Sequence, residues 1–195
     1  MSFQPKSLCV FCGSKNGNDP TYVEEAKALA RMMAKKEIEL VYGGGSIGIM
    51  GIIAQEILDH GGRVTGVIPE FLQKHEVGHH GLSELIITES MHERKRTMFE
   101  KSDGFIVLPG GLGTMDETFE IMTWKQLRLH NKPIIVLDTK DYWQPFHQLV
   151  EATIAGGFAH EGVRDLYCLV KTAKSVFECF EDIPDVLEEV FTSHL

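Results

Sequence analysis

Short apolar runs alternate with longer amphipathic stretches along most of this chain. The runs are rich in Val, Ile and Leu and have the length of strands rather than of helices. Runs of this kind, in which apolar and polar residues do not alternate, are typical of strands covered on both faces of a sheet. They predict strands at residues 7–12, 38–42, 63–68, 85–88, 105–108, 134–137 and 166–170.

Helical spacing of apolar residues fills the intervals between these strands. Asp19 and Pro20 favour a helix start, and the apolar side chains that follow share one helical face, namely Tyr22, Ala26, Leu29, Ala30 and Met33. Ser90 and Glu93 have the spacing of a capping box and predict a second helix start. Further helices are expected at residues 50–60, 114–129 and 142–154 and from residues 172 and 184, and a long His-rich loop is expected at residues 70–83.

The alternation of strands and helices predicts βαβ units. Such units build an α/β fold with a mostly parallel, doubly wound sheet and helices on both faces. At 195 residues the chain is long enough for one such domain, and no stretch reads as a linker, so residues 1–195 are predicted to form a single domain. The carboxyl ends of the parallel strands meet at one edge of the sheet, where ligands of this fold class bind.

The most distinctive stretch is Pro109-Gly110-Gly111-Leu112-Gly113-Thr114-Met115-Asp116-Glu117, between a predicted strand and a predicted helix. Glycines there allow φ > 0 and a close approach of the backbone to a ligand, and the positive end of the helix dipole favours an anion. The stretch therefore predicts a phosphate site. A structural alternative stands beside it, because Thr114 and Glu117 also have the spacing of a capping box.

Other unusual residues follow other strands of the predicted sheet. Gly13 and Ser14 come after the first strand, Gly43 to Gly45 after the second, and Arg94 after the fourth. All of them fall on the same edge as the glycine-rich stretch. An anion cradle, a cation at Arg94 and a carboxylate at Glu117 suit a phosphorylated sugar whose anomeric carbon becomes cationic when a glycosidic C–N bond breaks. Such a reaction requires neither a metal nor a cofactor.

Two other classes of function fit parts of the sequence. Gly43, Gly45 and Gly48 match the glycine spacing of a dinucleotide site, with Glu70 at the distance expected for a ribose contact, which is typical of an oxidoreductase. The same crevice also suits a carrier or sensor that binds a nucleotide or cofactor without turnover. The Walker A pattern is absent from the sequence, which argues against a P-loop ATPase.

Charge and composition narrow the partners and the compartment. The chain has 19 basic and 28 acidic residues, a formal net charge of −9, which repels nucleic acid polymers and anionic lipid. A small anion held by backbone dipoles is still compatible with that charge. No apolar run has membrane-spanning length, and residues 1–6 lack the apolar segment of a signal peptide, so a soluble cytoplasmic protein is expected.

The cysteines and histidines do not predict a metal site. Cys9 and Cys12 lie in the first predicted strand, where residues three apart point to opposite faces, so buried free thiols are favoured over a metal or redox pair. His75, His79 and His80 lack a companion cysteine or acidic cluster with metal spacing. These histidines are expected to be solvated or to belong to a lid.

Met91-His92-Glu93-Arg94-Lys95, followed by the glycine-rich stretch, resembles the paired signature of the Lonely Guy (LOG) family, the cytokinin riboside 5′-monophosphate phosphoribohydrolases. Cys12-Gly13-Ser14, Tyr42-Gly43-Gly44-Gly45 and Gly48-Ile49-Met50-Gly51 resemble earlier motifs of that family. The resemblance covers roughly residues 8–142. It implies a Rossmann-like fold, a homodimer or larger homo-oligomer with the site near the subunit interface, and hydrolysis of AMP or N6-modified AMP to free base and ribose 5-phosphate.

The resemblance also assigns roles to residues. It implies that Arg94 and Glu117 are the catalytic pair and that Lys95, Thr123 and the residues from Gly111 to Asp116 line the substrate, with Asp116 where the family often has Glu. With the other glycine loops and the family's substrate-contacting glutamate placed at Glu76, the candidate substrate-binding residues are Gly13, Ser14, Gly43, Gly44, Gly45, Glu76, Met91, Arg94, Lys95, Gly110, Gly111, Leu112, Gly113, Thr114, Met115, Asp116, Glu117, Glu120 and Thr123.

Three further expectations concern the helix after the glycines and the chemistry of the family. Glu120 either orients Arg94 or faces water, and Phe119, Met122 and Leu127 are expected in the core or in an interface. Some relatives carry the label of lysine decarboxylase. A pyridoxal phosphate site needs a Schiff-base lysine and an acidic partner for the ring nitrogen, and no such pair stands out in the sequence.

Overall fold

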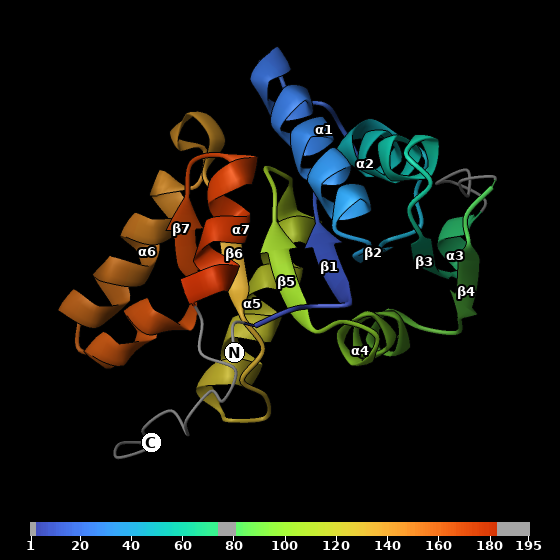
Figure 1. The fold of residues 1–195 in the computed structure, drawn as a ribbon. Helices are drawn as coiled ribbons and strands as arrows, with labels where there is room; N and C mark the ends of the chain where they lie inside the picture. Colours follow the sequence, from blue (N-terminus) through green and yellow to red (C-terminus); the bar gives the residue numbers. More distant parts are fainter. Residues whose placement is uncertain (1–2, 74–80, 183–195) are drawn as a thin grey trace.

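The strands of the computed structural model, which describes residues 3–73 and 81–182, form one parallel sheet (Figure 1). They are β1 (Ser7–Phe11), β2 (Glu39–Tyr42), β3 (Val64–Pro69), β4 (Glu84–Thr88), β5 (Gly104–Val107), β6 (Ile134–Leu137) and β7 (Cys168–Val170). Their order is β4-β3-β2-β1-β5-β6-β7, and every neighbouring pair is parallel. The predicted α/β fold with a doubly wound parallel sheet is therefore confirmed.

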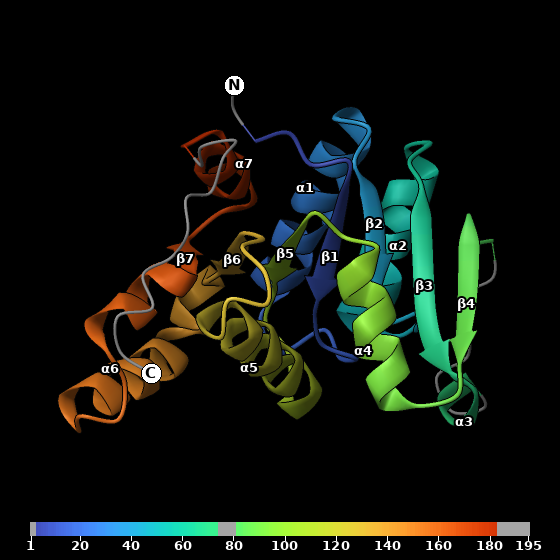
Figure 2. The same cartoon turned by 90° about the horizontal axis from the view of Figure 1, so that it is seen from below.

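Helices cover both faces of the sheet. One face carries α1 (Pro20–Lys35), α2 (Gly48–Asp59) and α7 (Ala173–Asp182), and the other carries α4 (Met91–Glu100), α5 (Leu112–Gln126) and α6 (Gln144–Ala155). In Figure 2 the second set lies in front of the sheet, with α1 and α2 behind it. Since α4 and α5 share a face, side chains from their first turns can meet.

The two cores are separated by the sheet, and β1 contributes to both. Cys9 packs in the core beneath α4 and α5, and Cys12 packs in the core beneath α1 and α2. Both are buried free thiols on opposite faces, as predicted. Burial raises the pKa of each thiol well above its usual range, with a smaller contribution from the negative charge of Glu117. Neither thiol is activated as a nucleophile.

The helix starts confirm two predictions and correct one. Asp19 caps α1 by accepting a hydrogen bond from the Thr21 N–H at 2.9 Å, and Ser90 caps α4 by accepting one from the Glu93 N–H at 3.2 Å. The alternative capping box at Thr114 is wrong. Helix α5 already begins at Leu112, with Gly111 as N-cap and no side-chain cap, so Thr114 lies inside the first turn.

Several boundaries differ from the expected ones. The expected loop after β3 begins with a short helix, α3 (Glu70–Gln73), while residues 74–80 and the helix expected from residue 184 lie outside the described residues. Helix α5 ends at Gln126, and Arg128 then has a left-handed φ of 59°. Helix α6 and strand β7 each begin two residues later than expected, at Gln144 and Cys168. They follow the 3-10 turns η1 (Thr139–Asp141) and η2 (Glu161–Leu166), respectively. No helix in the described parts of the chain is long and apolar enough to cross a bilayer.

Candidate active site

A buried ion pair joins α4 to α5 near the sheet. Arg94 Nη1 donates a hydrogen bond to Glu117 Oε1 at 3.1 Å, and Arg94 Nε donates to the Val67 carbonyl of β3 at 3.1 Å. Arg94 is 8% exposed and Glu117 9%. Burying two charges is costly unless they are paired and further hydrogen-bonded, and the Val67 carbonyl supplies the further bond to the guanidinium. The Arg94 side chain is therefore buried between the two helices and the sheet, not exposed to solvent on the surface of α4.

A second ion cluster, between Lys95 and two carboxylates, holds the same two helices together. Lys95 Nζ lies 2.8 Å from Asp116 Oδ2 and 3.0 Å from Glu120 Oε2. Burial alone would lower the pKa of Lys95, but its hydrogen bonds to the two carboxylates and their charges outweigh that effect and raise the pKa. Glu120 thus pairs with Lys95, which differs from both expected roles. The cluster links the amino-terminal halves of α4 and α5 beside the Arg94–Glu117 pair.

The glycines after β2 make room for the protein's own chain. A Cβ on Gly43 would lie 2.2 Å from Arg94 Nη2, and a Cβ on Gly48, whose φ is +62°, would lie 2.2 Å from the Ser14 carbonyl carbon. Packing within the protein therefore requires glycine at both positions, without any bound dinucleotide. Two of the three glycines whose spacing favoured an oxidoreductase, Gly43 and Gly48, are thus explained by packing against Arg94 and the loop after β1.

Gly43→Ala is expected to displace the Arg94 guanidinium while the charge of every group is preserved. The LOG resemblance implies a catalytic role for Arg94, and a misplacement of about 1 Å in a catalytic group typically costs about 10²-fold in rate. We therefore expect kcat to fall by about that factor in a steady-state assay of the AMP hydrolysis that the resemblance implies. Gly162→Ala is the matched control, because its added Cβ would meet its nearest neighbour at 3.4 Å. Full activity of Gly43→Ala would contradict the geometry.

A cavity of about 370 Å³ lies at the carboxyl ends of β1 and β5, where the strand order reverses. Its walls are the loop from Gly13 to Gly17, the turn from Pro109 to Gly111, and the side chains of Tyr22, Ile49 and Tyr142. The Gly13 N–H donates to the Pro109 carbonyl at 3.1 Å, which joins the two loops. This volume is typical of small-molecule sites.

Two helices that begin beside this cavity, α2 and α5, have no side-chain cap. Helix α5 has Gly111 as N-cap and α2 has Ile47, whereas α1 and α4 are capped by their own Asp19 and Ser90. The first N–H groups of a helix have no partner within it, and the helix dipole adds partial positive charge there. The start of α5 is therefore suited to an anionic ligand.

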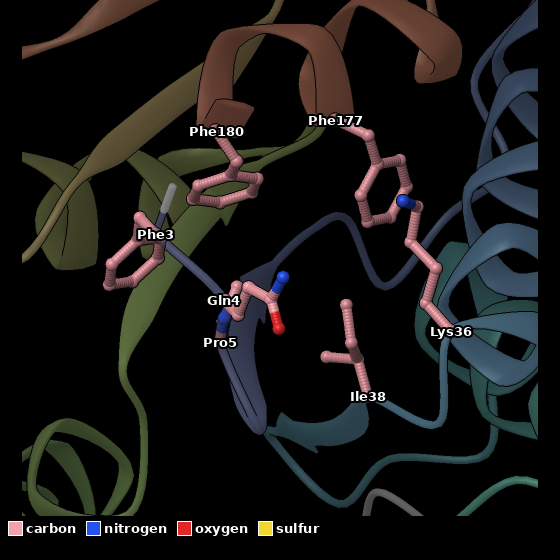
Figure 3. Close-up of a pocket in the computed structure, with 7 residues that line it drawn as sticks. All are labelled: Phe3, Gln4, Pro5, Lys36, Ile38, Phe177 and Phe180. Atoms are coloured by element: carbon pink, nitrogen blue, oxygen red, sulfur yellow. The ribbon is translucent and has the colours of Figure 1, made fainter. Parts of the chain in front are cut away.

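A second cavity, of about 450 Å³, lies at the opposite edge of the sheet (Figure 3). It is lined by Phe3, Gln4, Pro5, Lys36, Ile38, Phe177 and Phe180. Pro5 and Ile38 precede β1 and β2, so this cavity lies at the amino ends of the strands. The ion pair and the uncapped helix start belong to the other edge, which makes the first cavity the candidate active site.

Comparison with known proteins identifies the family of this chain. Residues 50–180 match the family model described as "Possible lysine decarboxylase". The chain is 44% identical over 168 residues to a cytokinin riboside 5′-monophosphate phosphoribohydrolase of Rhodococcoides fascians, which covers 86% of this chain and 85% of the relative. This chain belongs to the LOG family. A second LOG relative, a probable cytokinin riboside 5′-monophosphate phosphoribohydrolase of Oryza sativa subsp. japonica, is 42% identical over 183 residues, or 94% of this chain and 82% of the relative.

Solved structures with lower identity share the LOG fold. A molybdenum cofactor binding protein from Rippkaea orientalis has a TM-score of 0.68 at 21% identity and covers 89% of this chain and 93% of its own. The molybdenum cofactor carrier protein of Chlamydomonas reinhardtii has a TM-score of 0.66 at 19% identity, with coverage of 89% and 94%. At this identity the likeness concerns the arrangement of the sheet and helices.

The structure brings many of the LOG signature residues to one edge of the sheet. Those at the glycine loops and in the first two turns of α4 and α5 are Gly13, Ser14, Gly43, Gly44, Gly45, Met91, Arg94, Lys95, Gly110, Gly111, Leu112, Gly113, Thr114, Met115, Asp116 and Glu117. Thr123 lies about 9 Å further along α5 than Glu117, given the rise of 1.5 Å per residue, and its hydroxyl donates to the Phe119 carbonyl at 2.7 Å. Glu76 lies outside the described residues.

Sequence reasoning missed the Val67 carbonyl and the two tyrosines of the cavity. Val67 contributes a backbone oxygen, which leaves no trace in residue type. Tyr22 reads as one apolar position of α1, and Tyr142 reads as part of the helix expected at residues 142–154. Only the packing of η1 against the start of α1 reveals that both line the cavity.

Proposed function

We propose that this LOG-family protein is a phosphoribohydrolase that cleaves the N-glycosidic bond of adenosine 5′-monophosphate or its N6-modified forms. The products are the free base and ribose 5-phosphate. The observation that carries the proposal is the buried Arg94–Glu117 pair, at 3.1 Å, close to the uncapped start of α5. The names of the relatives from Rhodococcoides fascians and Oryza sativa support the same reaction.

The glycine turn is proposed to bind the 5′-phosphate. Gly111, the N-cap of α5, and Ser14 line the same cavity, and the first N–H groups of α5 have no side-chain cap. These dipoles are fixed before the ligand arrives, so they bind an anion despite the net charge of −9. With the phosphate bound at the start of α5, the sugar would extend toward Glu117 of the same helix.

Glu117 is proposed to act at the sugar. Cleavage breaks the bond from C1′ to the base nitrogen, and the electron pair of this bond leaves with the base. A water oxygen then bonds to C1′, and the proton that this water loses balances the proton that the base nitrogen takes up. A fixed carboxylate stabilises the positive charge that develops on the sugar, and it can orient the water. Arg94 holds the carboxylate in one orientation through its Nη1, and the Val67 carbonyl in turn holds the guanidinium. Arg94 therefore serves catalysis by holding the Glu117 carboxylate in place.

The description "Possible lysine decarboxylase" names a different reaction, which we do not propose. A Schiff base forms from a neutral amine. Lys95, the lysine next to Arg94, is held by Asp116 and Glu120, and these contacts raise its pKa. A protonated, ion-paired lysine is a poor nucleophile for a pyridoxal aldehyde.

A single assay tests the proposed reaction. Purified protein is incubated with AMP and with isopentenyladenosine monophosphate, and chromatography measures free base and ribose 5-phosphate. Release of both products in equal amounts is expected. Binding without product would contradict the hydrolase and support a nucleotide carrier, while a nicotinamide absorbance that copurifies would support an oxidoreductase.

We also propose that the protein is a homodimer formed through the outer face of α5. Leu112 and Phe119 on α5 and Leu127, its C-cap, are 84%, 38% and 46% exposed. Helical spacing places Asp116 and Thr123 on the same face. A row of exposed apolar side chains on one helix is typical of an interface. In a two-fold dimer this face meets its own copy, so Thr123 of each subunit would lie near the partner's α5.

Phe119→Asp should therefore convert the dimer to a monomer. The charge would be buried twice in a symmetric interface, once from each subunit, and light scattering after gel filtration should show a mass near the 21.9 kDa of one chain. Phe158→Asp is the control, since Phe158 is 92% exposed in the loop that follows α6, and the dimer should persist. A wild-type protein that is itself monomeric would contradict the proposal.

A further inference from the structure

Tyr142 contacts the glycine turn at the point where α5 begins. Its hydroxyl donates a hydrogen bond to the Gly110 carbonyl at 2.5 Å. Gly110 directly precedes Gly111, the N-cap of α5. The Gly110 carbonyl and the Gly111 N–H belong to one planar trans peptide group, so they point in opposite directions. A bond that fixes the carbonyl therefore also fixes the direction of the N–H.

This peptide has little else to hold its orientation. It joins two glycines, which have more backbone freedom than other residues. Within residues 3–73 and 81–182, no group accepts a hydrogen bond from the Gly111 N–H. On the other side, a Cβ on Gly110 would lie 2.1 Å from Thr114 Oγ1, so Thr114 packs closely beneath the turn without bonding the peptide. Among the described residues, the bond from the Tyr142 hydroxyl is the one hydrogen bond that this peptide group makes.

The turn that precedes Tyr142 has a strained backbone, which buried hydrogen bonds hold in place. Asp138, which is fully buried, accepts hydrogen bonds from the Trp143 N–H at 2.6 Å and from Lys171 Nζ at 2.6 Å. Between Asp138 and Tyr142, Lys140 and Asp141 both have left-handed φ values, of 58° and 60°. Left-handed backbone in non-glycine residues is uncommon and persists where surrounding contacts enforce it, often at functional sites.

The tyrosine ring is held separately from its hydroxyl. It makes edge contacts with Tyr22 at 5.8 Å and with Trp143 at 5.1 Å between ring centroids. Lys140 also pairs with Asp19, the N-cap of α1, at 3.5 Å. Removing the hydroxyl alone therefore leaves the ring and the turn anchored.

We propose that Tyr142 is a positioning residue, which directs the Gly110–Gly111 peptide so that the Gly111 N–H joins the donors for the substrate's phosphate. Its role rests on the proposed function, because it assumes that this turn binds the phosphate. Tyr142 acts through Gly111 and takes no part in the bond cleavage at C1′. Its loss should therefore weaken binding of every ligand that carries the phosphate and spare the chemical step.

Tyr142→Phe tests the role. One hydrogen bond to an anion is typically worth about tenfold in affinity, so we expect KM for AMP and the inhibition constant for ribose 5-phosphate each to rise about tenfold. We expect kcat to stay within about twofold, because Glu117 and Arg94 are untouched. A purely structural role would instead lower kcat and the melting temperature together.

Tyr167→Phe is the matched control. This substitution also removes one tyrosine hydroxyl, which contacts His147 Nδ1 at 2.8 Å. Tyr167, however, packs against Phe146 of α6. Neither KM nor the inhibition constant should change. Unchanged ribose 5-phosphate affinity in Tyr142→Phe, or a fall in kcat as large as the rise in KM, would overturn the proposal.

Calorimetry with ribose 5-phosphate separates this inference from the proposed function. If the wild type binds ribose 5-phosphate but does not hydrolyse AMP, the hydrolase proposal fails, and a tenfold weaker affinity in Tyr142→Phe still supports the positioning role. If the wild type does not bind ribose 5-phosphate, the phosphate turn and the role of Tyr142 fail together.

Discussion

Glu117→Gln should lower kcat for AMP hydrolysis by about 10²–10³-fold, the usual effect of removing one group that stabilises transition-state charge. Gln keeps the shape of the side chain and an oxygen that can accept from Arg94 Nη1, so the fold is expected to persist. What is lost is the negative charge opposite the sugar. The measurement is kcat under saturating AMP, with circular dichroism to verify folding.

Glu151→Gln provides the comparison. Glu151 forms a two-bond pair with Arg164, with both distances at 2.7 Å, but the pair is exposed on the surface. Exposed pairs contribute little to stability, so neither kcat nor folding should change. Hydrolysis that survives Glu117→Gln at full rate would remove the proposed mechanism and leave the fold as described.

Arg94→Met should destabilise the protein as well as abolish activity. It leaves the Glu117 carboxylate buried without its cation, and breaking a buried pair in this way typically costs about 3–5 kcal/mol in the free energy of unfolding. A melting temperature lower by roughly 10 °C is expected. Thermal unfolding followed by circular dichroism measures the change.

The double variant Arg94→Met/Glu117→Gln tests whether Arg94→Met destabilises the protein by breaking the ion pair or by removing packing contacts. Because it removes both charges, it should be more stable than Arg94→Met alone, and the two single effects should not add. Additive losses would mean that the two side chains stabilise the fold independently. In that case the 3.1 Å contact would not be the reason for the burial of Arg94.

Much of the architecture was predictable from local patterns. The apolar runs predicted every strand, and Asp19 and Ser90 marked the starts of α1 and α4, because strand burial and helix capping act over a few residues. The rule that parallel strands end at one edge then predicted where the glycine loops would gather. The prediction failed at Thr114, where a capping pattern lies inside a helix that begins two residues earlier.

The sequence by itself determined the α/β class, the edge of the sheet that carries the glycine turns and the identity of the LOG signature. Only the tertiary structure decided that Arg94 is bound by both Glu117 and the Val67 carbonyl, that Glu120 pairs with Lys95, and that Tyr142 reaches Gly110. The physical reason is range. Periodicity and capping are local, whereas these contacts join residues from 23 to 32 positions apart, and their partners are chosen by how α4, α5 and η1 pack on the sheet.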